Sequence, residues 1–314
     1  MKNKNLLLFI GIFLSGIFIL GAPLIGEKTF YPSAYFVKSN IILLKLRFPQ
    51  TLMAYGVGFL LSIVGLLYQT IFHNDLAGPY TLGVSSGSAF GAALGIIFFP
   101  FIQPFVFSLL FGLGVTLVLL LVYSDRKNIL TKMILLGVTL NFFFASNILL
   151  LYYFSDMSSS FEIYHWLMGS IYIVGYQNVF ILFLTTLPFY IYVILNTKKF
   201  NILLFQKDLA LSKGVNVNRL TFILIGLSSL LVSLAVAFTG PISFVGLIAP
   251  HITKQIVGKN HKFTLVNSGI MGGLLLVFCF TFSRIILFPT ILPVGIMTGF
   301  LGSLFFVFLL FRKK

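Results

Sequence analysis

Acidic side chains are scarce in this chain, whose 314 residues include only six Asp and Glu against 21 Lys and Arg. All charged residues together make up 9% of the chain, whereas they make up about 25% of an ordinary soluble domain. Hydrophobic residues account for 59%, so too few polar groups remain to cover a water-facing surface. This composition excludes secreted domains, cytosolic enzymes and nucleic-acid binders, and it indicates a chain that lies mostly in lipid.

Cysteine is nearly absent as well, because Cys279 is the only one and lies inside an apolar run. A single cysteine excludes a disulfide framework and a cysteine-based zinc site. The four histidines, His73, His165, His251 and His261, have no metal-binding spacing and no carboxylate pairing. We therefore expect no metal site.

Residues for catalysis or energy coupling are missing too. No glycine-rich loop with a lysine is present to bind nucleotide phosphates. No Asp or Glu lies in the middle of an apolar run, where it would indicate a proton or ion relay. We expect no catalytic residue and no cofactor bound by this chain. An ion-coupled secondary transporter and a polytopic membrane enzyme remain alternatives, although this chain lacks the side chains that either class normally needs.

The apolar runs predict an all-α polytopic membrane protein with ten transmembrane helices in a single domain, 1–314. A helix needs about 20 apolar residues to cross the bilayer, and prolines divide the runs that are too long for one helix. Pro100 and Pro104 divide one such run, and Pro241 divides another. The predicted spans are 5–24, 48–71, 81–99, 104–123, 132–154, 177–196, 220–239, 243–257, 264–286 and 294–311, of which 243–257 is short.

Basic residues predict the orientation. With the N-terminus in the cytoplasm and the first helix uncleaved, sixteen of the 21 Lys and Arg fall on the cytoplasmic side, as the positive-inside rule requires. The other five fall outside and are Lys28, Lys38, Lys45, Arg47 and Arg284. Ten spans return the C-terminus to the cytoplasm. The net charge of +15 is therefore a topology signal that needs no nucleic-acid partner.

Small residues form a stripe in the third predicted span, where Gly83, Gly87, Gly91 and Gly95 recur every four residues. Such a stripe lets helix backbones approach closely. Packing within the chain is favoured over a dimer interface as its purpose.

Several distinct sequence motifs follow one another along nearly the whole chain. They include LRFPQTLMAYGVGFLLSIVGLLYQTIFHNDLAGPYTLGVSSGSAFGAALG at 46–95, DLALSKGVNVNR at 208–219, TGPISFVGLIAPHI at 239–252 and LPVGIMTG at 292–299. Segment 135–146 and the run WLMGS at 166–170 add to them. Together they resemble the signatures of the FecCD-type permeases, the membrane subunits of ATP-binding-cassette (ABC) importers for ferric siderophores, haem and cobalamin.

This resemblance implies a type II ABC importer permease in a bacterial cytoplasmic (inner) membrane. It implies a second permease, identical or paralogous, at whose interface the pathway lies. Two cytoplasmic ATPase subunits would bind ATP and Mg²⁺, and an extracytoplasmic binding protein would deliver the substrate. A ferric siderophore is the first expectation for that substrate, with haem or cobalamin next.

The resemblance also implies roles for residues at the two membrane faces. On the cytoplasmic side, segment 205–219 would contact the ATPase through Asp208, Ala210, Leu211, Gly214, Val215 and Arg219. A solvated basic loop is the alternative for that segment. On the outer side, Lys45, Arg47 and Arg284 would dock the binding protein. Arg284 has a second interpretation, in which it only extends its charge to the membrane surface.

Further implied roles concern the path between the faces. The cytoplasmic gate would include Asn74, Leu76 and Thr131. The pathway would be lined by Asn141, Ser146, Asn147, Met297 and Thr298. The chain departs from the family pattern at Gln50, where a second Arg is common, and at Asp75, Gly78 and Lys213. The departures at Asp75 and Gly78 leave the gate geometry open, the one at Gln50 leaves the number of docking charges open, and the one at Lys213 concerns the ATPase contact.

Overall fold

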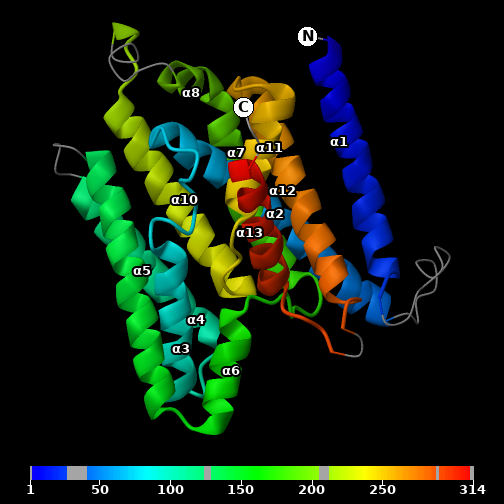
Figure 1. The fold of residues 1–314 in the computed structure, drawn as a ribbon, viewed down its shortest axis with the longest axis vertical. Coiled ribbons are helices and arrows are strands. Elements are labelled where there is room, and N and C mark those ends of the chain that lie inside the picture. The colour runs from blue at the N-terminus through cyan, green and yellow to red at the C-terminus, as the bar shows by residue number, and fades with distance from the viewer. Residues whose placement is uncertain (1, 27–40, 124–128, 205–211, 288–289, 312–314) are drawn as a thin grey trace. The chain divides into compact units, whose positions relative to one another are not determined.

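The computed structural model describes residues 2–26, 41–123, 129–204, 212–287 and 290–311 (Figure 1). In these segments every regular element is helical. The α-helices are α1 (Lys2–Gly21), α2 (Phe48–Ile71), α3 (Val84–Phe98), α4 (Pro104–Tyr123), α5 (Ile129–Phe154), α6 (Met157–Leu167), α7 (Gln177–Leu195), α8 (Thr197–Leu203), α10 (Val217–Thr239), α11 (Val245–Val257), α12 (His261–Ser283) and α13 (Val294–Phe311). A 3-10 turn, η1 (Ala22–Leu24), follows α1, and a π-helical turn, η3 (Ile42–Arg47), leads into α2.

The predicted fold class is confirmed, and each of the ten predicted spans corresponds to one of these helices. Eight helices in the described part of the chain are long and apolar enough to cross a membrane. The remaining two are α3, with 15 residues, and α11, with 13. The span predicted at 81–99 began too early, because the turn before α3 continues to Gly83, whose backbone is left-handed.

The chain forms two compact units that alternate along the sequence. Unit 1 comprises Met1–Leu66, Ser170–Pro188 and Ile242–Lys314, and unit 2 comprises Leu67–Gly169 and Phe189–Pro241. Helices α2 and α7 therefore contribute residues to both units.

In unit 1 the backbones of α2 and α12 touch. A Cβ on Gly58 would collide with the carbonyl oxygen of Gly272, and a Cβ on Gly272 would collide with that of Gly58. One turn further along, the Ser62 hydroxyl donates to the Ser268 carbonyl at 2.6 Å. Close packing and hydroxyl hydrogen bonds of this kind hold helices together in lipid, where the hydrophobic effect does not drive helix association. Helix α12 also packs against α1, which runs beside it in Figure 1, and against α11 and α13.

In unit 2 the small-residue stripe of α3 is a packing surface within the chain, as the sequence predicts. A Cβ on Gly91 would collide with the Phe107 carbonyl of α4, and one on Gly87 would meet Val115 of α4 and Phe144 of α5. Helix α3 also contacts α6 and α10.

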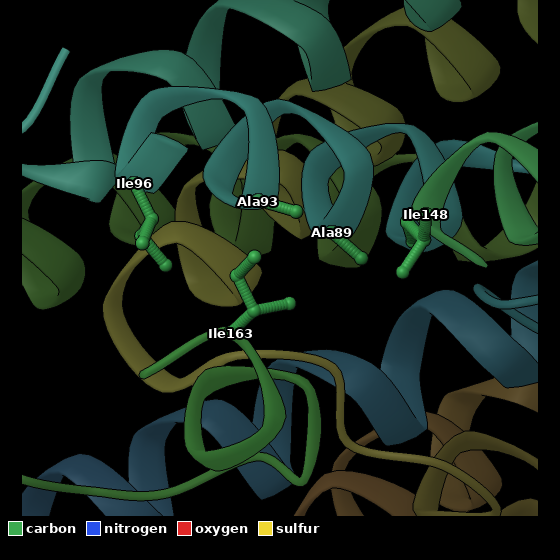
Figure 2. Packing of buried hydrophobic residues seen from close by; sticks show 5 residues of the cluster. All are labelled: Ala89, Ala93, Ile96, Ile148 and Ile163. Atoms are coloured by element: carbon green, nitrogen blue, oxygen red, sulfur yellow. The ribbon is translucent and has the colours of Figure 1, made fainter. Parts of the chain in front are cut away.

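The short helix α6 is held against α3 by one buried cluster, formed by Ala89, Ala93, Ile96, Ile148 and Ile163. Figure 2 shows the Ile163 side chain pointing from α6 towards the α3 residues of the cluster. Ile163 is completely buried. Its methyl groups fit there because the two alanines leave room on the surface of α3.

Helix α10 joins α2 through a neutral polar network inside unit 2. Tyr68 is fully buried, and its hydroxyl accepts a hydrogen bond from Ser228 at 2.7 Å and lies 3.1 Å from the Ser229 hydroxyl. The network satisfies polar atoms that lipid cannot.

The break predicted at Gly240-Pro241 is present. Helix α10 ends at Thr239, and Gly240 follows with φ of 66°. A side chain there would meet the Trp166 carbonyl and the Gly169 Cα. Glycine is therefore required both for the backbone angle and for the close approach.

Candidate functional site

The outer end of unit 1 holds a pocket of about 260 Å³. Its walls come from η3, the first turn of α2, segment 170–172, the end of α12 and the start of α13. Two guanidinium groups, those of Arg47 and Arg284, line it together with the amide of Gln50. No carboxylate is among the described residues that line the pocket.

Both arginines anchor the turn η1. Arg284 donates from Nη2 to the Ala22 carbonyl at 2.8 Å, and Arg47 donates from Nη1 to the Pro23 carbonyl at 3.3 Å. The Arg284 guanidinium also lies over the Phe280 ring, 4.7 Å from its centre, which is a favourable position for a cation.

Arg284 is only 7% exposed, and its Nε and Nη1 have no hydrogen-bond partner in the described part of the chain. The structure thus places Arg284 inside the pocket, where it is neither a rim charge nor a side chain extended into water. Lys45 is exposed and Arg47 is half-buried. The docking role of these three residues stays a prediction.

Gln50, which stands where the family commonly has a second Arg, bonds within unit 1. Its Nε2 donates to the Ile173 carbonyl at 3.2 Å. Two more hydrogen bonds tie the same segment to η3, from Gly175 N to the Lys45 carbonyl and from the Tyr176 hydroxyl to the Leu44 carbonyl, each at 2.8 Å. The amide therefore contributes to holding one wall of the pocket.

The predicted gate residues Asn74 and Leu76 lie together in the exposed turn after α2. The Asn74 side chain accepts a hydrogen bond from Leu76 N at 2.9 Å, and His73 before it has φ of 47°. Leu76 is 60% exposed although it is apolar. Thr131, the third predicted gate residue, is exposed near the start of α5.

The loop that leads into α3 is fixed to α5. Asn141 donates from Nδ2 to the Tyr80 carbonyl at 3.3 Å, and a Cβ on Gly137 would collide with the Thr81 carbonyl. Asn141, predicted to line the pathway, is half-buried. Because of its bond to the Tyr80 carbonyl, it also positions the loop between the predicted gate residues and α3.

The other predicted lining residues fall into two classes. Ser146 is exposed on α5, and Asn147 is half-buried, with its amide bonded to the Phe143 carbonyl at 2.8 Å. Met297 and Thr298 on α13 are only 7% and 1% exposed, so they face the interior of unit 1 in this structure. Their lining role stays a prediction.

Part of the predicted ATPase contact is described. Asp208, Ala210 and Leu211 lie outside the described residues. Gly214 is exposed with φ of 73°, Val215 is buried, and Arg219 is exposed.

The turn that contains Gly214 leads directly into α10. The Asn216 side chain caps α10 by accepting a hydrogen bond from Arg219 N at 3.0 Å. Gly214 and the residues after it therefore form a defined turn, and the contact of this turn with the ATPase remains a prediction.

No group of three metal-ligating side chains occurs within the segments that the structure describes. The acid Asp156 precedes α6 and is fully exposed, and the hydroxyls of Ser158 and Ser159 lower the pKa of its carboxyl to about 2. It stays ionised at neutral pH and lies outside the spans, so it is not an intramembrane relay.

Comparison with protein-family models identifies the family of this chain. The model of the FecCD transport family matches residues 6–312. The chain belongs to the FecCD transport family. It is therefore a permease subunit of an ABC transporter, a transport component and not an enzyme, and it crosses the bacterial inner membrane several times.

Related permeases whose names give different substrates resemble this FecCD permease along most of their length. It is 34% identical to the vitamin B12 import system permease protein of Vibrio cholerae, over 99% of this chain and 95% of that one. It is 33% identical to the molybdate import system permease protein of Haemophilus influenzae, over 87% and 82% respectively. A solved structure of an inward-facing metal-chelate type ABC transporter matches 99% of this chain and 100% of its own, with a TM-score of 0.87 and 31% identity.

Family membership implies an ATPase, a substrate-binding protein and a partner permease. Sequence analysis named Gln50 only as a departure from the family pattern. Its bond to the Ile173 carbonyl was not predicted, because it depends on tertiary packing that no local pattern indicates.

Proposed function

We propose that this permease carries an iron chelate inward across the cytoplasmic membrane, with a ferric siderophore as the first candidate and haem or cobalamin next. It works as a pair of permeases, identical or paralogous, on two cytoplasmic ATPase subunits that bind ATP and Mg²⁺. An extracytoplasmic binding protein delivers the substrate, and it docks on the outer side through Lys45, Arg47 and Arg284. The full-length likeness to a metal-chelate type ABC transporter is the observation that supports this most strongly.

Helix α5 supports a shared pathway on physical grounds. Along it, Leu135, Phe142 and Leu149 are each about two-thirds exposed, at 66%, 71% and 68%. The hydroxyl of Thr139 on the same helix bonds back to its own backbone, at the Leu135 carbonyl, at 3.0 Å. The face is therefore neutral and only weakly polar, which suits a conduit that must let a bulky cargo leave as easily as it enters.

The placement of charge supports an external source of energy. In the described helices that are long enough to cross the membrane, every Asp, Glu, Lys and Arg lies near a helix end. Ion-coupled carriers place ionisable groups at membrane depth. Segment 205–219 is the proposed contact through which the ATPase drives the cycle.

The test is uptake into proteoliposomes that hold the permease with its ATPase and binding protein. Labelled ferric siderophore, haem, cobalamin and molybdate are supplied separately, and ATP is supplied inside or omitted. We expect ATP-dependent accumulation of a ferric siderophore. Accumulation of molybdate alone would reject the iron-chelate proposal while leaving the ABC mechanism intact.

A second measurement separates the classes of mechanism. ATP hydrolysis by the full assembly should rise when the loaded binding protein is added. Transport by the isolated permease without any ATPase would support an ion-coupled carrier. Chemical turnover of a lipid by the isolated chain would support a membrane enzyme.

A further inference from the structure

A narrow groove lies between three helices of unit 1, near their cytoplasmic ends. It has a volume of about 170 Å³ and is lined by residues of α1, α11 and α12. Helices α1 and α11 both pack on α12, so α12 forms the floor of the groove and the other two helices form its sides. Figure 1 shows the N-terminal end of α1 and the loop between α11 and α12 at the same end of unit 1. Because the N-terminus is cytoplasmic, this is the cytoplasmic end of the unit.

The sides of the groove are open to lipid. Ile10 and Leu14 on the α1 side are 42% and 40% exposed, and Ile256 on the α11 side is 53% exposed. Leu7 and Met271 extend the apolar lining along α1 and α12. In helices that lie in a membrane, exposed side chains of this kind contact hydrocarbon.

The polar residues in the described lining, Thr253 and Asn267, bond within their own helices. The Thr253 hydroxyl donates to the Ala249 carbonyl at 2.8 Å, and the Asn267 Nδ2 donates to the Phe263 carbonyl at 2.7 Å. Their hydrogen atoms are therefore used inside the protein, and the groove favours an apolar ligand.

The shape of the groove indicates which apolar ligand fits. Its lining extends from Leu7 to Leu14 on α1 and from Asn267 to Leu274 on α12, which is about 10 Å along each axis at 1.5 Å per residue. A space of about 170 Å³ drawn out over that length is narrower than an α-helix, which is about 10–12 Å across with its side chains. A single hydrocarbon chain therefore fits, whereas a helix from another protein does not.

Three lysines lie at the cytoplasmic end of the groove, within the stretch 254–262, which contains no acid. Lys254 is in the last turn of α11, and Lys259 and Lys262 are exposed in and just after the loop that leads into α12. The loop has a fixed form, because the Asn260 side chain caps α12 by accepting a hydrogen bond from Lys262 N at 3.0 Å. Basic residues beside the cytoplasmic end of a membrane helix attract anionic lipids.

We propose that this groove binds an anionic phospholipid of the cytoplasmic leaflet. One acyl chain lies on α12 between α1 and α11, and the phosphate lies against Lys259 and Lys262. The lysines select the charge of the headgroup, and the groove holds the chain of one lipid molecule. The inference depends neither on the proposed substrate nor on the outer residues that are predicted to dock the binding protein.

The first test measures lipid binding to the purified full-length permease by native mass spectrometry. Dioleoyl phosphatidylglycerol is the probe, and we expect it to bind more tightly than dioleoyl phosphatidylcholine. Ile10→Trp fills the groove and should weaken phosphatidylglycerol binding about tenfold, the loss expected when about ten van der Waals contacts of the chain are removed. The matched control is Ile12→Trp on the same helix. Ile12 is 53% exposed but is not a groove residue, so the affinity should stay unchanged.

A lysine variant tests the headgroup and keeps the proposal falsifiable if Ile10→Trp unfolds. Lys262→Gln should lower the affinity for phosphatidylglycerol about fivefold, the contribution of one lysine near an anionic lipid surface, and should leave the affinity for phosphatidylcholine unchanged. The control is Lys199→Gln, which removes an exposed lysine of α8 in unit 2 and should change neither affinity.

The second test locates the chain. A phosphatidylglycerol that carries a diazirine in one acyl chain is photolysed in proteoliposomes with the permease, and the labelled peptides are identified by mass spectrometry. We expect labelling of groove residues on α1, α11 or α12, and less of it in Ile10→Trp.

Four outcomes would overturn the proposal. They are labelling confined to other helices, equal affinity for the two lipids in wild type, unchanged phosphatidylglycerol affinity in folded Ile10→Trp, and an equal loss in Ile12→Trp. Dissociation of a permease pair in Ile10→Trp, with lipid binding unchanged, would instead assign the groove to a second copy of the chain.

Discussion

Gly214 illustrates how one residue defines the turn before α10. Its φ is 73°, and a Cβ built on it would meet no atom of the described residues within 4 Å. The requirement for glycine is therefore set by the backbone angle and not by space. Left-handed backbone costs about 1–2 kcal/mol for most side chains, whereas Asn adopts it more easily.

We predict that Gly214→Val lowers the ratio of substrate imported to ATP hydrolysed about fivefold or more, because it strains the turn of the proposed ATPase contact. Gly214→Asn is the matched control and should retain most of the ratio. Both are measured in proteoliposomes that hold the full assembly. An unchanged ratio in Gly214→Val, with the protein folded, would contradict a coupling role for this turn.

Helix α6 buries a single side chain, that of Ile163. It has only 11 residues, and isolated helices of that length are marginal in water. Ile163 supplies its contact with the alanines of α3 (Figure 2).

We predict that Ile163→Ala lowers the free energy of unfolding by about 2–5 kcal/mol, because it leaves a cavity in a fully buried cluster. Phe161→Ala is the control on the same helix, since Phe161 is 67% exposed. Thermal unfolding of both variants in the same detergent measures the difference. Equal losses would show that α6 is held by something other than this cluster.

The helices themselves were largely predictable, because the length of an apolar run and the position of prolines are local properties. The predicted and observed bounds coincide at both ends for α2, α4 and α13. The π-helical turn η3 was not predicted, since nothing in the run ILLKLR distinguishes it from an ordinary helical turn.

For the whole molecule, the sequence predicted the fold class and the family but not the burial of particular side chains. The motifs located Arg284, Met297 and Thr298, yet all three are buried within unit 1. Burial depends on which helices pack together, and an apolar pattern does not say which partners a helix has. The alternation of the two units along the chain was unpredictable for the same reason.

Measuring association with the binding protein tests the predicted docking role of the outer surface of the permease. Lys45 is exposed whereas Arg284 is not, so a change at Lys45 leaves the pocket intact. We predict that Lys45→Glu weakens binding-protein association severalfold at low salt, and that the difference from wild type shrinks at high salt because exposed charges are screened. Surface plasmon resonance at two salt concentrations measures it, with Lys45→Gln as an intermediate. Unchanged affinity at low salt would remove Lys45 from the docking surface.

The hydroxyl network of Tyr68, Ser228 and Ser229 has one more consequence. Moving an elementary charge through a membrane voltage of 100 mV involves about 2.3 kcal/mol, but these groups carry no net charge. Helices joined by them can shift without transferring charge through the electric field. Rearrangements of this part of the protein should therefore be electrically silent.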